Sequence, residues 1–270
     1  MIRFEEDTHS YVSTDGSNIK WSSVTTVVGQ FKNKFDSKVI AEKSSKNKKS
    51  KWYGLSVDEI LQIWENEKNR STDLGSWYHN QRERDLLSHS TITRNGFLCE
   101  IKKPIVESGY KIAPSQSLSN NTIYPEHFVY LKSAGICGQS DLVEVINNKL
   151  FIIDYKSNKT IEKESYVDWE GKRKMMLRPV QHLQDCNLIH YTLQLSLYAY
   201  IILKHNPHLT LGGLELLHIK FEEESLDRYG YPIYKKDLDG NFIVKNIETI
   251  EIPYLKKECM SIIEYKNNKK

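Results

Sequence analysis

The stretch DLVEVINNKLFIIDYK, residues 141–156, consists of two apolar runs joined by an Asn-Asn turn. Asparagine tolerates the left-handed backbone of a tight two-residue turn, so the stretch predicts a β-hairpin. Directly opposed residues of such a hairpin have Cβ atoms roughly 4.5–5.5 Å apart and share one face of the sheet. The expected pairs are Val145–Leu150, Val143–Ile152 and Asp141–Asp154.

The facing acids Asp141 and Asp154 repel each other unless a cation lies between them. Lys156 follows Asp154 by two residues, so strand alternation returns it to the same face. Carboxylates are ligands for Mg²⁺ or Mn²⁺, and the backbone carbonyl of Tyr155 could supply a further oxygen. A lysine beside them could orient water or neutralise a phosphate. The hairpin therefore predicts a phosphodiester-hydrolysing metal centre, although an Asp–Lys pair at a strand end is also a common surface feature worth little energy.

Composition fits a globular chain with a core, and the basic residues are unevenly distributed. The chain has 270 residues, 39% hydrophobic residues and a net charge of +3. Residues 38–51 contain six lysines and one glutamate, and residues 159–179 form a polar loop or arm. Such runs are usually solvated surface, but beside a phosphodiester-cutting centre they are candidate nucleic-acid contacts. The candidates are Lys46, Lys48, Lys49, Lys172 and Arg173.

The cysteines and apolar segments indicate a reduced protein without a membrane anchor. The four cysteines lie far apart and form no Cys-x-x-Cys spacing, so no structural zinc site or iron–sulfur motif is indicated. The first residues lack an apolar signal region. The longest apolar stretch, near residues 193–203, is interrupted by polar residues and too short to span a bilayer. We expect an intracellular protein with no membrane partner.

Helical and strand patterns are intermixed along the chain, which predicts an α/β fold with a mixed central sheet flanked by helices. Ser56 and Glu59 form a capping-box pattern that opens a helix. The other expected elements are a second helix from near Thr72 to Leu87, a loop at 111–121, a strand at 126–131, a helix at 191–203 and a strand at 214–221.

Three motifs together resemble one nuclease superfamily. Gly138-x-x-Asp141, Ile153-Asp154-Tyr155-Lys156 and Gln194-x-x-x-Tyr198 occur in the order and spacing of PD-(D/E)XK nucleases. The closest resemblance is to the RecB-like branch, which includes CRISPR-associated nucleases, phage exonucleases and the mitochondrial genome maintenance exonuclease. Gly75-x-x-x-His79 resembles the histidine motif of that branch. The motifs span slightly under half of the chain, and they are specific only in combination.

This resemblance implies a restriction-endonuclease-like core and a set of roles. It implies one nuclease domain over 1–270, with the core at about 72–221 and elaborations at 1–71 and 222–270. His79 would be a metal ligand beside Asp141 and Asp154, and Glu126 is an additional candidate ligand. Gln194 and Tyr198, one helical turn apart, would contact DNA or orient the catalytic lysine.

The implied activity is a metal-dependent DNA exonuclease acting on single strands or DNA ends, in phage-type replication, recombination or repair. A phage-encoded protein of this kind would work in the cytoplasm of a bacterial host, with replication or recombination proteins as possible partners. Two alternatives stay open: a structure-specific or restriction-type endonuclease, and a DNA-binding scaffold without turnover.

Two further features refine this expectation. The chain has no phosphate-binding loop, so no nucleotide cofactor is expected, and only Cys259 follows Cys186, so no iron–sulfur cluster is expected. Aromatic side chains near the motifs could stack on bases, although we expect at least half of them to pack in the core. These are Trp52, Tyr53, Trp77, Tyr78 and Trp169.

Overall fold

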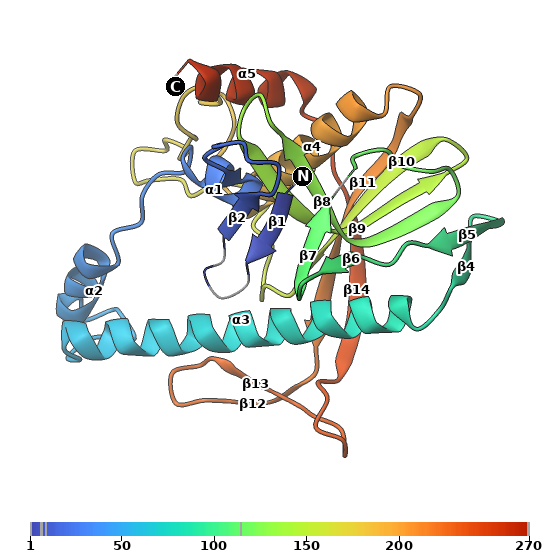
Figure 1. The fold of residues 1–270 in the computed structure, drawn as a ribbon. Helices are drawn as coiled ribbons and strands as arrows, with labels where there is room; N and C mark the ends of the chain where they lie inside the picture. Colours follow the sequence, from blue (N-terminus) through green and yellow to red (C-terminus); the bar gives the residue numbers. More distant parts are fainter. Residues whose placement is uncertain (1, 6–7, 9, 114, 269–270) are drawn as a thin grey trace.

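The computed structural model of the chain describes residues 2–5, 8, 10–113 and 115–268. Within them lies a curled, mixed eight-stranded sheet with helices against it (Figure 1). The helices are α1 (Val24–Gly29), α2 (Ser37–Lys46), α3 (Val57–Leu87), α4 (Asn187–His205) and α5 (Lys256–Asn267). The strands are β1 (Ile2–Glu5), β2 (Ser10–Ser13), β3 (Ser22–Ser23), β4 (Thr91–Arg94), β5 (Phe97–Ile101), β6 (Ile105–Glu107), β7 (Tyr110–Ala113), β8 (Thr122–Leu131), β9 (Ile136–Ile146), β10 (Lys149–Lys156), β11 (Thr210–Phe221), β12 (Glu223–Leu226), β13 (Pro232–Tyr234) and β14 (Val244–Glu251).

The sheet order is β14-β11-β10-β9-β8-β5-β4, and β3 pairs with β9. Strands β8, β9 and β10 form an antiparallel meander, whereas β10 and β11 are parallel. Parallel neighbours need a long crossover, and α4 lies within the connection that supplies it. The predicted mixed sheet flanked by helices is therefore confirmed. None of the described helices is long and apolar enough to cross a membrane.

The predicted hairpin is present as β9 and β10. Asn147 and Asn148 have φ angles of 49° and 59°, as a turn with two left-handed residues requires. The pairs Val145–Leu150 and Val143–Ile152 are those expected from the sequence. Backbone pairing ends at Leu142–Ile153, so the two aspartates come one position beyond the last paired residues.

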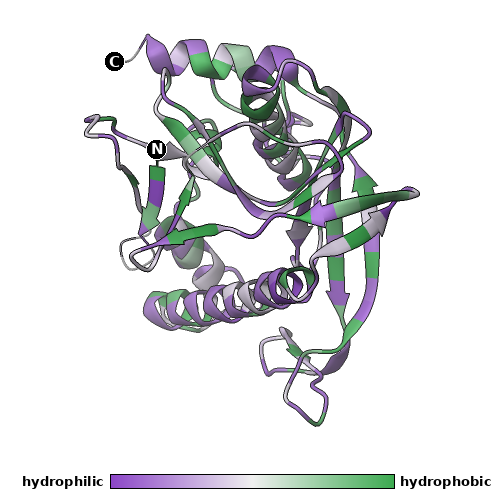
Figure 2. Ribbon diagram, turned by 45° about the vertical axis from the view of Figure 1, so that its right-hand side comes forward, coloured by the Kyte–Doolittle hydropathy of each residue, from purple (hydrophilic) through white to green (hydrophobic). Residues whose placement is uncertain are grey.

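Strand β10 is buried on both faces because helices cover the sheet on each side. Leu150 and Ile152 belong to a core that includes side chains of α1, α4 and α5. Phe151, Ile153 and Tyr155 face the other way, toward a second core that includes side chains of α3. Figure 2 shows hydrophobic residues along the strands and a largely hydrophilic α3, which contributes only part of its surface to the core.

The prediction of two helices between Ser56 and Leu87 is wrong, because α3 is one continuous helix of 31 residues. Ser56 caps it with the expected capping box. A helix of this length extends about 46 Å. A glycine such as Gly75 lowers the stability of a helix by about 1 kcal/mol relative to alanine, but it does not break the helix. A Cβ at Gly75 would lie 3.1 Å from Ser157 Oγ, so glycine lets α3 pass close to the end of β10.

Two further boundaries differ from the expectation. The segment expected as a loop at 111–121 begins with β7, which pairs with β1 in a separate sheet of order β2-β1-β7-β6. Strand β11 begins at Thr210 and includes Gly212, which was expected to precede it. A Cβ at Gly212 would lie 2.5 Å from Phe151 Cζ, so the phenyl ring occupies the space that a side chain would need.

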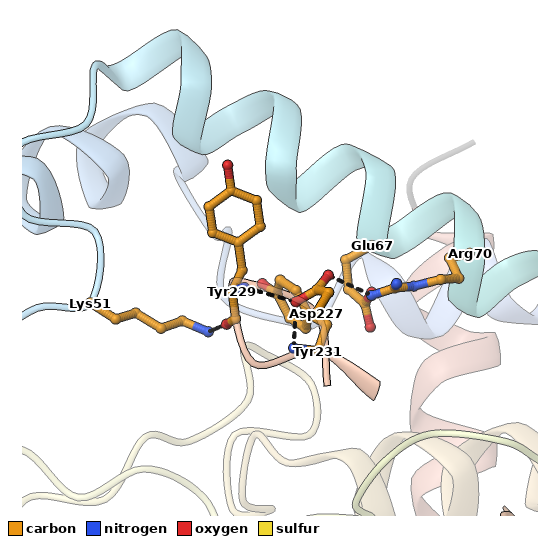
Figure 3. Close-up of polar contacts among 6 residues, drawn as sticks. All are labelled: Lys51, Glu67, Arg70, Asp227, Tyr229 and Tyr231. Carbon is orange, nitrogen blue, oxygen red and sulfur yellow. Dashed lines mark hydrogen bonds and ion pairs between the residues drawn. The ribbon is translucent and has the colours of Figure 1, made fainter. Parts of the chain in front are cut away.

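The turn between β12 and β13 is fastened to the region where α2 leads into α3 (Figure 3). Lys51 Nζ donates a hydrogen bond of 2.9 Å to the carbonyl of Tyr229 and lies 4.6 Å from the ring centre of Tyr231. Arg70 contacts Glu67 on its own helix and Asp227 of the turn, the latter at 3.4 Å. The N-terminal half of α3 is therefore held between α2 and this turn.

Candidate metal centre

Three acids lie in one row across the meander. The pairs Pro125–Leu142 and His127–Ser140 bracket the positions of Glu126 on β8 and Asp141 on β9, so these two acids are opposite each other. On the other side of β9, the register that ends at Leu142–Ile153 brings Asp154 of β10 opposite Asp141. The row is thus Glu126–Asp141–Asp154. The sequence predicted its Asp141–Asp154 half, and the β8–β9 register adds Glu126.

Glu126 has a strained backbone. Its φ is 48°, in the left-handed region that residues with side chains rarely adopt. Such a conformation costs of the order of 1–3 kcal/mol and persists only where the surrounding structure imposes it. Strain of this kind clusters at binding and catalytic sites, so the conformation of Glu126 is itself an indication of function.

His79 of α3 completes a group that could hold a metal ion. Its Nδ1 lies 3.4 Å from Asp141 Oδ1, and its Nε2 lies 3.3 Å from the carbonyl oxygen of Tyr155. Ligand atoms of His79, Glu126 and Asp141 all lie within 4.8 Å of one another. Imidazole and carboxylate are a donor set that Mn²⁺ accepts, and Mg²⁺ takes the oxygens alone. The carbonyl of Tyr155 is close enough to His79 to belong to the same coordination space.

Asp154 has a different set of partners from Asp141. One of its carboxylate oxygens contacts the ammonium of Lys156, and the other accepts a hydrogen bond of 3.2 Å from Gln194 Nε2. Asp141 instead accepts a hydrogen bond of 2.7 Å from the backbone N–H of Tyr155. The three groups that converge on one point are therefore His79, Glu126 and Asp141, and Asp154 lies next to them at the lysine end of the row.

The motif residue Tyr198, expected to contact DNA or to orient the catalytic lysine, is buried. Only 3% of its surface is exposed, so its ring has no face to offer to a substrate. Its ring lies against Gly138. Gln194, one helical turn before Tyr198 on α4, donates to Asp154. In this structure Tyr198 packs α4 against β9.

We expect Gly138→Ala to destabilise the protein by about 1–3 kcal/mol, because a Cβ there would lie 2.8 Å from Tyr198 Cε1 in a packed core. Urea denaturation measures the change. Gly29→Ala is the matched control, since a Cβ at Gly29 meets no atom within 4 Å, and we expect its free energy of unfolding to stay within about 0.5 kcal/mol. Equal stability of the two variants would contradict the close approach of β9 and α4.

Lys156 is held by residues that the sequence reasoning did not include. Its ammonium lies 4.8 Å from the ring centre of Tyr191, whose hydroxyl donates a 2.8 Å hydrogen bond to Asn158 Oδ1. The carbonyl of Asn158 lies 2.6 Å from Nε2 of the buried His218. Tyr191 precedes Gln194 by three residues, so the helical spacing that picked out Tyr198 could also have indicated Tyr191.

Burial and mutual repulsion decide the charges of the row. Burial, with the charge of Asp141 added, raises the pKa of Glu126 to about 8. Burial also raises the pKa of Asp154 to about 6, although Lys156 opposes the shift. For Asp141, burial is outweighed by the charges of His79 and Lys156, which hold its pKa below the usual value.

The two cations of the site stay charged at neutral pH. Burial alone would lower the pKa of His79, but the carboxylate of Asp141 raises it to about 9. Burial likewise opposes the charge of Lys156, and Asp154 and Asp141 raise its pKa above the usual value. At pH 7 two carboxylates therefore face two cations, and Glu126 holds a proton.

We expect the affinity for Mn²⁺ or Mg²⁺ to rise between about pH 6 and pH 8.5. Coordination requires His79 and Glu126 to lose protons that they hold at neutral pH, so each proton released strengthens binding as the pH increases. Calorimetric titration in buffers of different ionisation enthalpy counts these protons. Glu126→Gln should release one proton fewer than the wild type, and an affinity independent of pH would place the bound ion elsewhere.

The predicted basic contacts do not surround the carboxylate row. Lys46 ends α2, and Lys48 and Lys49 follow it, beside the N-terminal half of α3. Val57 and His79 are 22 residues apart on that helix, which corresponds to about 33 Å. Lys172 and Arg173 lie in the connection between β10 and α4, where Arg173 pairs with Glu164 at 2.8 Å. Only a long polymer could touch the lysines beside the start of α3 and the row together.

The aromatic candidates divide into two groups, as expected. Trp52 and Tyr78 are buried, and Trp77 is partly buried against Phe221, so these three serve packing. Tyr53 and Trp169 are exposed.

Comparison with known proteins assigns no family. No protein-family model matches the chain, and no curated protein matches it. Among solved structures, the chain is similar to one titled "Crystal structure of SSO0001", with 14% identity and a TM-score of 0.34, over 97% of this chain and 80% of that chain. A similarity at this level carries no argument about fold or activity.

Proposed function

We propose that this chain is a metal-dependent deoxyribonuclease with a restriction-endonuclease-like core. The observation that carries the proposal is the partly buried row of Glu126, Asp141 and Asp154, with His79 at one side and Lys156 at the other. The order of elements supports the same core: helix α3, the meander β8–β9–β10, helix α4, and then β11 parallel to β10. The sequence motifs that resemble the RecB-like branch coincide with this row.

The donor set fits a divalent ion. His79, Glu126 and Asp141 would hold it, and Asp154 and the carbonyl of Tyr155 lie beside them as further oxygen donors. A bound divalent ion supplies charge for a developing phosphate anion and lowers the pKa of a water molecule. In the metal-free site His79 and Glu126 carry protons, and a bound ion would displace these protons.

The other residues of the site would act on the phosphate and the attacking water. Lys156 is directed by its contact with Asp154 and by the ring of Tyr191, so its ammonium has a defined position. From there it would orient the water or neutralise charge on the phosphate as the P–O bond breaks. Gln194 holds Asp154 from the opposite side and keeps the pair aligned.

The substrate that we propose is single-stranded DNA or DNA ends. The enzyme would act on them in replication, recombination or repair. The test incubates the protein with end-labelled single- and double-stranded DNA in Mn²⁺ or Mg²⁺, beside the Asp154→Ala variant and a covalently closed circle. An exonuclease degrades the linear substrates and spares the circle, whereas cleavage of the circle favours the endonuclease alternative. Wild-type and variant proteins that are equally inactive would sink the nuclease proposal.

A non-catalytic DNA-binding scaffold is the remaining alternative. It would keep the fold and the polar contacts of the site but need not bind a divalent ion. Calorimetric titration with Mn²⁺ separates the two readings, because a nuclease requires an ion at Asp141 for turnover. Binding of DNA without any binding of Mn²⁺ would favour the scaffold.

A further inference from the structure

The connection between β10 and α4, residues 157–186, carries a hydrogen-bonded turn that we call the arm turn, residues 166–174. Val167 and Arg173 form an antiparallel bridge at its base. At its tip, Asp168 Oδ1 accepts backbone hydrogen bonds from Glu170 at 3.0 Å and from Lys172 at 2.8 Å. These contacts hold the backbone on both sides of residue 169.

Trp169 projects from this turn into solvent. Its side chain is 90% exposed, and Tyr166 on the same turn is 73% exposed. Tryptophan is highly buried on average, so a nearly fully exposed indole on a hydrogen-bonded turn is unusual. Tryptophan and tyrosine are enriched where proteins contact partners, which makes the arm turn a candidate contact surface.

Cations accompany these rings. Within the described part of the chain, Lys172 and Arg178 take part in no ion pair, whereas Arg173 and Lys174 are paired with acids at 2.8 Å and 3.4 Å. The acids of the turn are Asp168, whose carboxylate accepts the hydrogen bonds of the turn, and Glu170. The unpaired charge of Lys172, on the same turn as the exposed indole, matches a polyanion that has flat rings.

A second basic segment lies next to the arm. The backbone N–H of Leu177 donates to the carbonyl of Phe31 at 2.8 Å, and Asn33 Nδ2 donates to the carbonyl of Met175 at 2.7 Å. These bonds join the arm to the segment that leaves α1, which contains Lys32 and Lys34. Figure 1 shows the arm beside α1 at the edge of the molecule, and the segment continuing from there toward α2.

The arm is also tied to the candidate metal centre. It begins directly after Lys156, and the backbone N–H of Leu188 donates to the carbonyl of Glu162 at 3.1 Å. That bond fixes the first part of the arm to the start of α4, the helix that carries Gln194. A polymer bound at the arm turn is therefore held by the same segment that joins two parts of the centre.

We propose that Trp169 is a stacking platform for an unpaired base of a single-stranded nucleic acid, with the backbone along Lys172 and Arg178. The substrate class rests on the proposed function, but binding at Trp169 can be measured without turnover. In a duplex each base is already stacked on its neighbours, so only an unpaired base could use the indole. The platform thus selects single strands.

The test measures anisotropy of a labelled single-stranded 20-mer and of a blunt-ended duplex of the same sequence in EDTA, with the full chain. Trp169→Ala should weaken single-strand binding about 5- to 100-fold. Trp169→Phe should retain part of it, because the smaller ring still stacks. Duplex affinity should be the same for all variants. Leu238→Ala is the matched control, since Leu238 is a fully exposed apolar residue on another turn, and it should bind like the wild type.

Three outcomes would overturn the platform. They are wild-type protein that does not bind the single strand, Trp169→Ala protein that binds it unchanged, and an equal loss for single strand and duplex. If the arm turn instead contacts a protein, Trp169→Ala should bind the single strand unchanged. EDTA removes the ion, so binding is measured independently of cleavage. If binding depends on Trp169 but the protein cuts no DNA, only the nuclease proposal is refuted. Cleavage with binding independent of Trp169 would sink only the platform.

Discussion

Replacing Asp141 with asparagine should abolish tight binding of Mn²⁺ and lower turnover at least about 100-fold. Asp141 is the central acid of the row and contacts both His79 and the N–H of Tyr155, at 3.4 Å and 2.7 Å. Asparagine keeps the size and an oxygen that can accept the Tyr155 hydrogen bond, but it removes the charge. Calorimetric titration with Mn²⁺ and the rate of cleavage of end-labelled DNA measure the two effects.

A metal-free measurement accompanies this prediction. The carboxylate of Asp141 is the main reason that the pKa of His79 lies at about 9 despite burial, so the variant should lower that pKa. Nuclear magnetic resonance titration of the imidazole reports it. Glu144→Gln is the control, because Glu144 lies on the same strand, is also buried, and pairs with Arg94 at 3.1 Å outside the row. Unchanged Mn²⁺ affinity in Asp141→Asn would refute the assigned centre.

Replacing Lys156 with methionine should lower turnover at least about 100-fold while Mn²⁺ and DNA binding persist. Methionine keeps a long apolar side chain against Tyr191 but lacks the ammonium that contacts Asp154. Without the ammonium, the buried Asp154 takes up a proton. The variant therefore loses less stability than it would with a charged, unpaired carboxylate at that position. Single-turnover cleavage, together with metal and DNA titrations, separates chemistry from binding.

Lys159→Met is the matched control for the lysine. Lys159 is exposed and lies three residues further along the chain, so its replacement removes the same charge without touching Asp154. We expect the control to cleave at close to the wild-type rate. Turnover of Lys156→Met within a few-fold of the wild type would show that Lys156 serves only as an ion-pair partner for Asp154.

Local patterns predicted much of the fold because their causes are local. The Asn147-Asn148 turn and the alternation of β10 follow from backbone preferences and side-chain period, and both are confirmed. The sequence analysis divided α3 near Thr72, ahead of Gly75, whose small size serves the approach of Ser157. The expected loop at 111–121 instead begins with β7, which pairs with the adjacent β6 and also with β1, about a hundred residues earlier.

The sequence by itself determined that Asp141, Asp154 and Lys156 come together, because one short turn sets their register. Only the tertiary structure decided that Glu126 joins the row and that His79 meets Asp141, since these contacts depend on how β8 pairs and where α3 crosses the strand ends. It also decided that Tyr198 is buried. Local backbone geometry acts between neighbours in the chain, whereas such contacts depend on how the core packs segments that are distant in sequence.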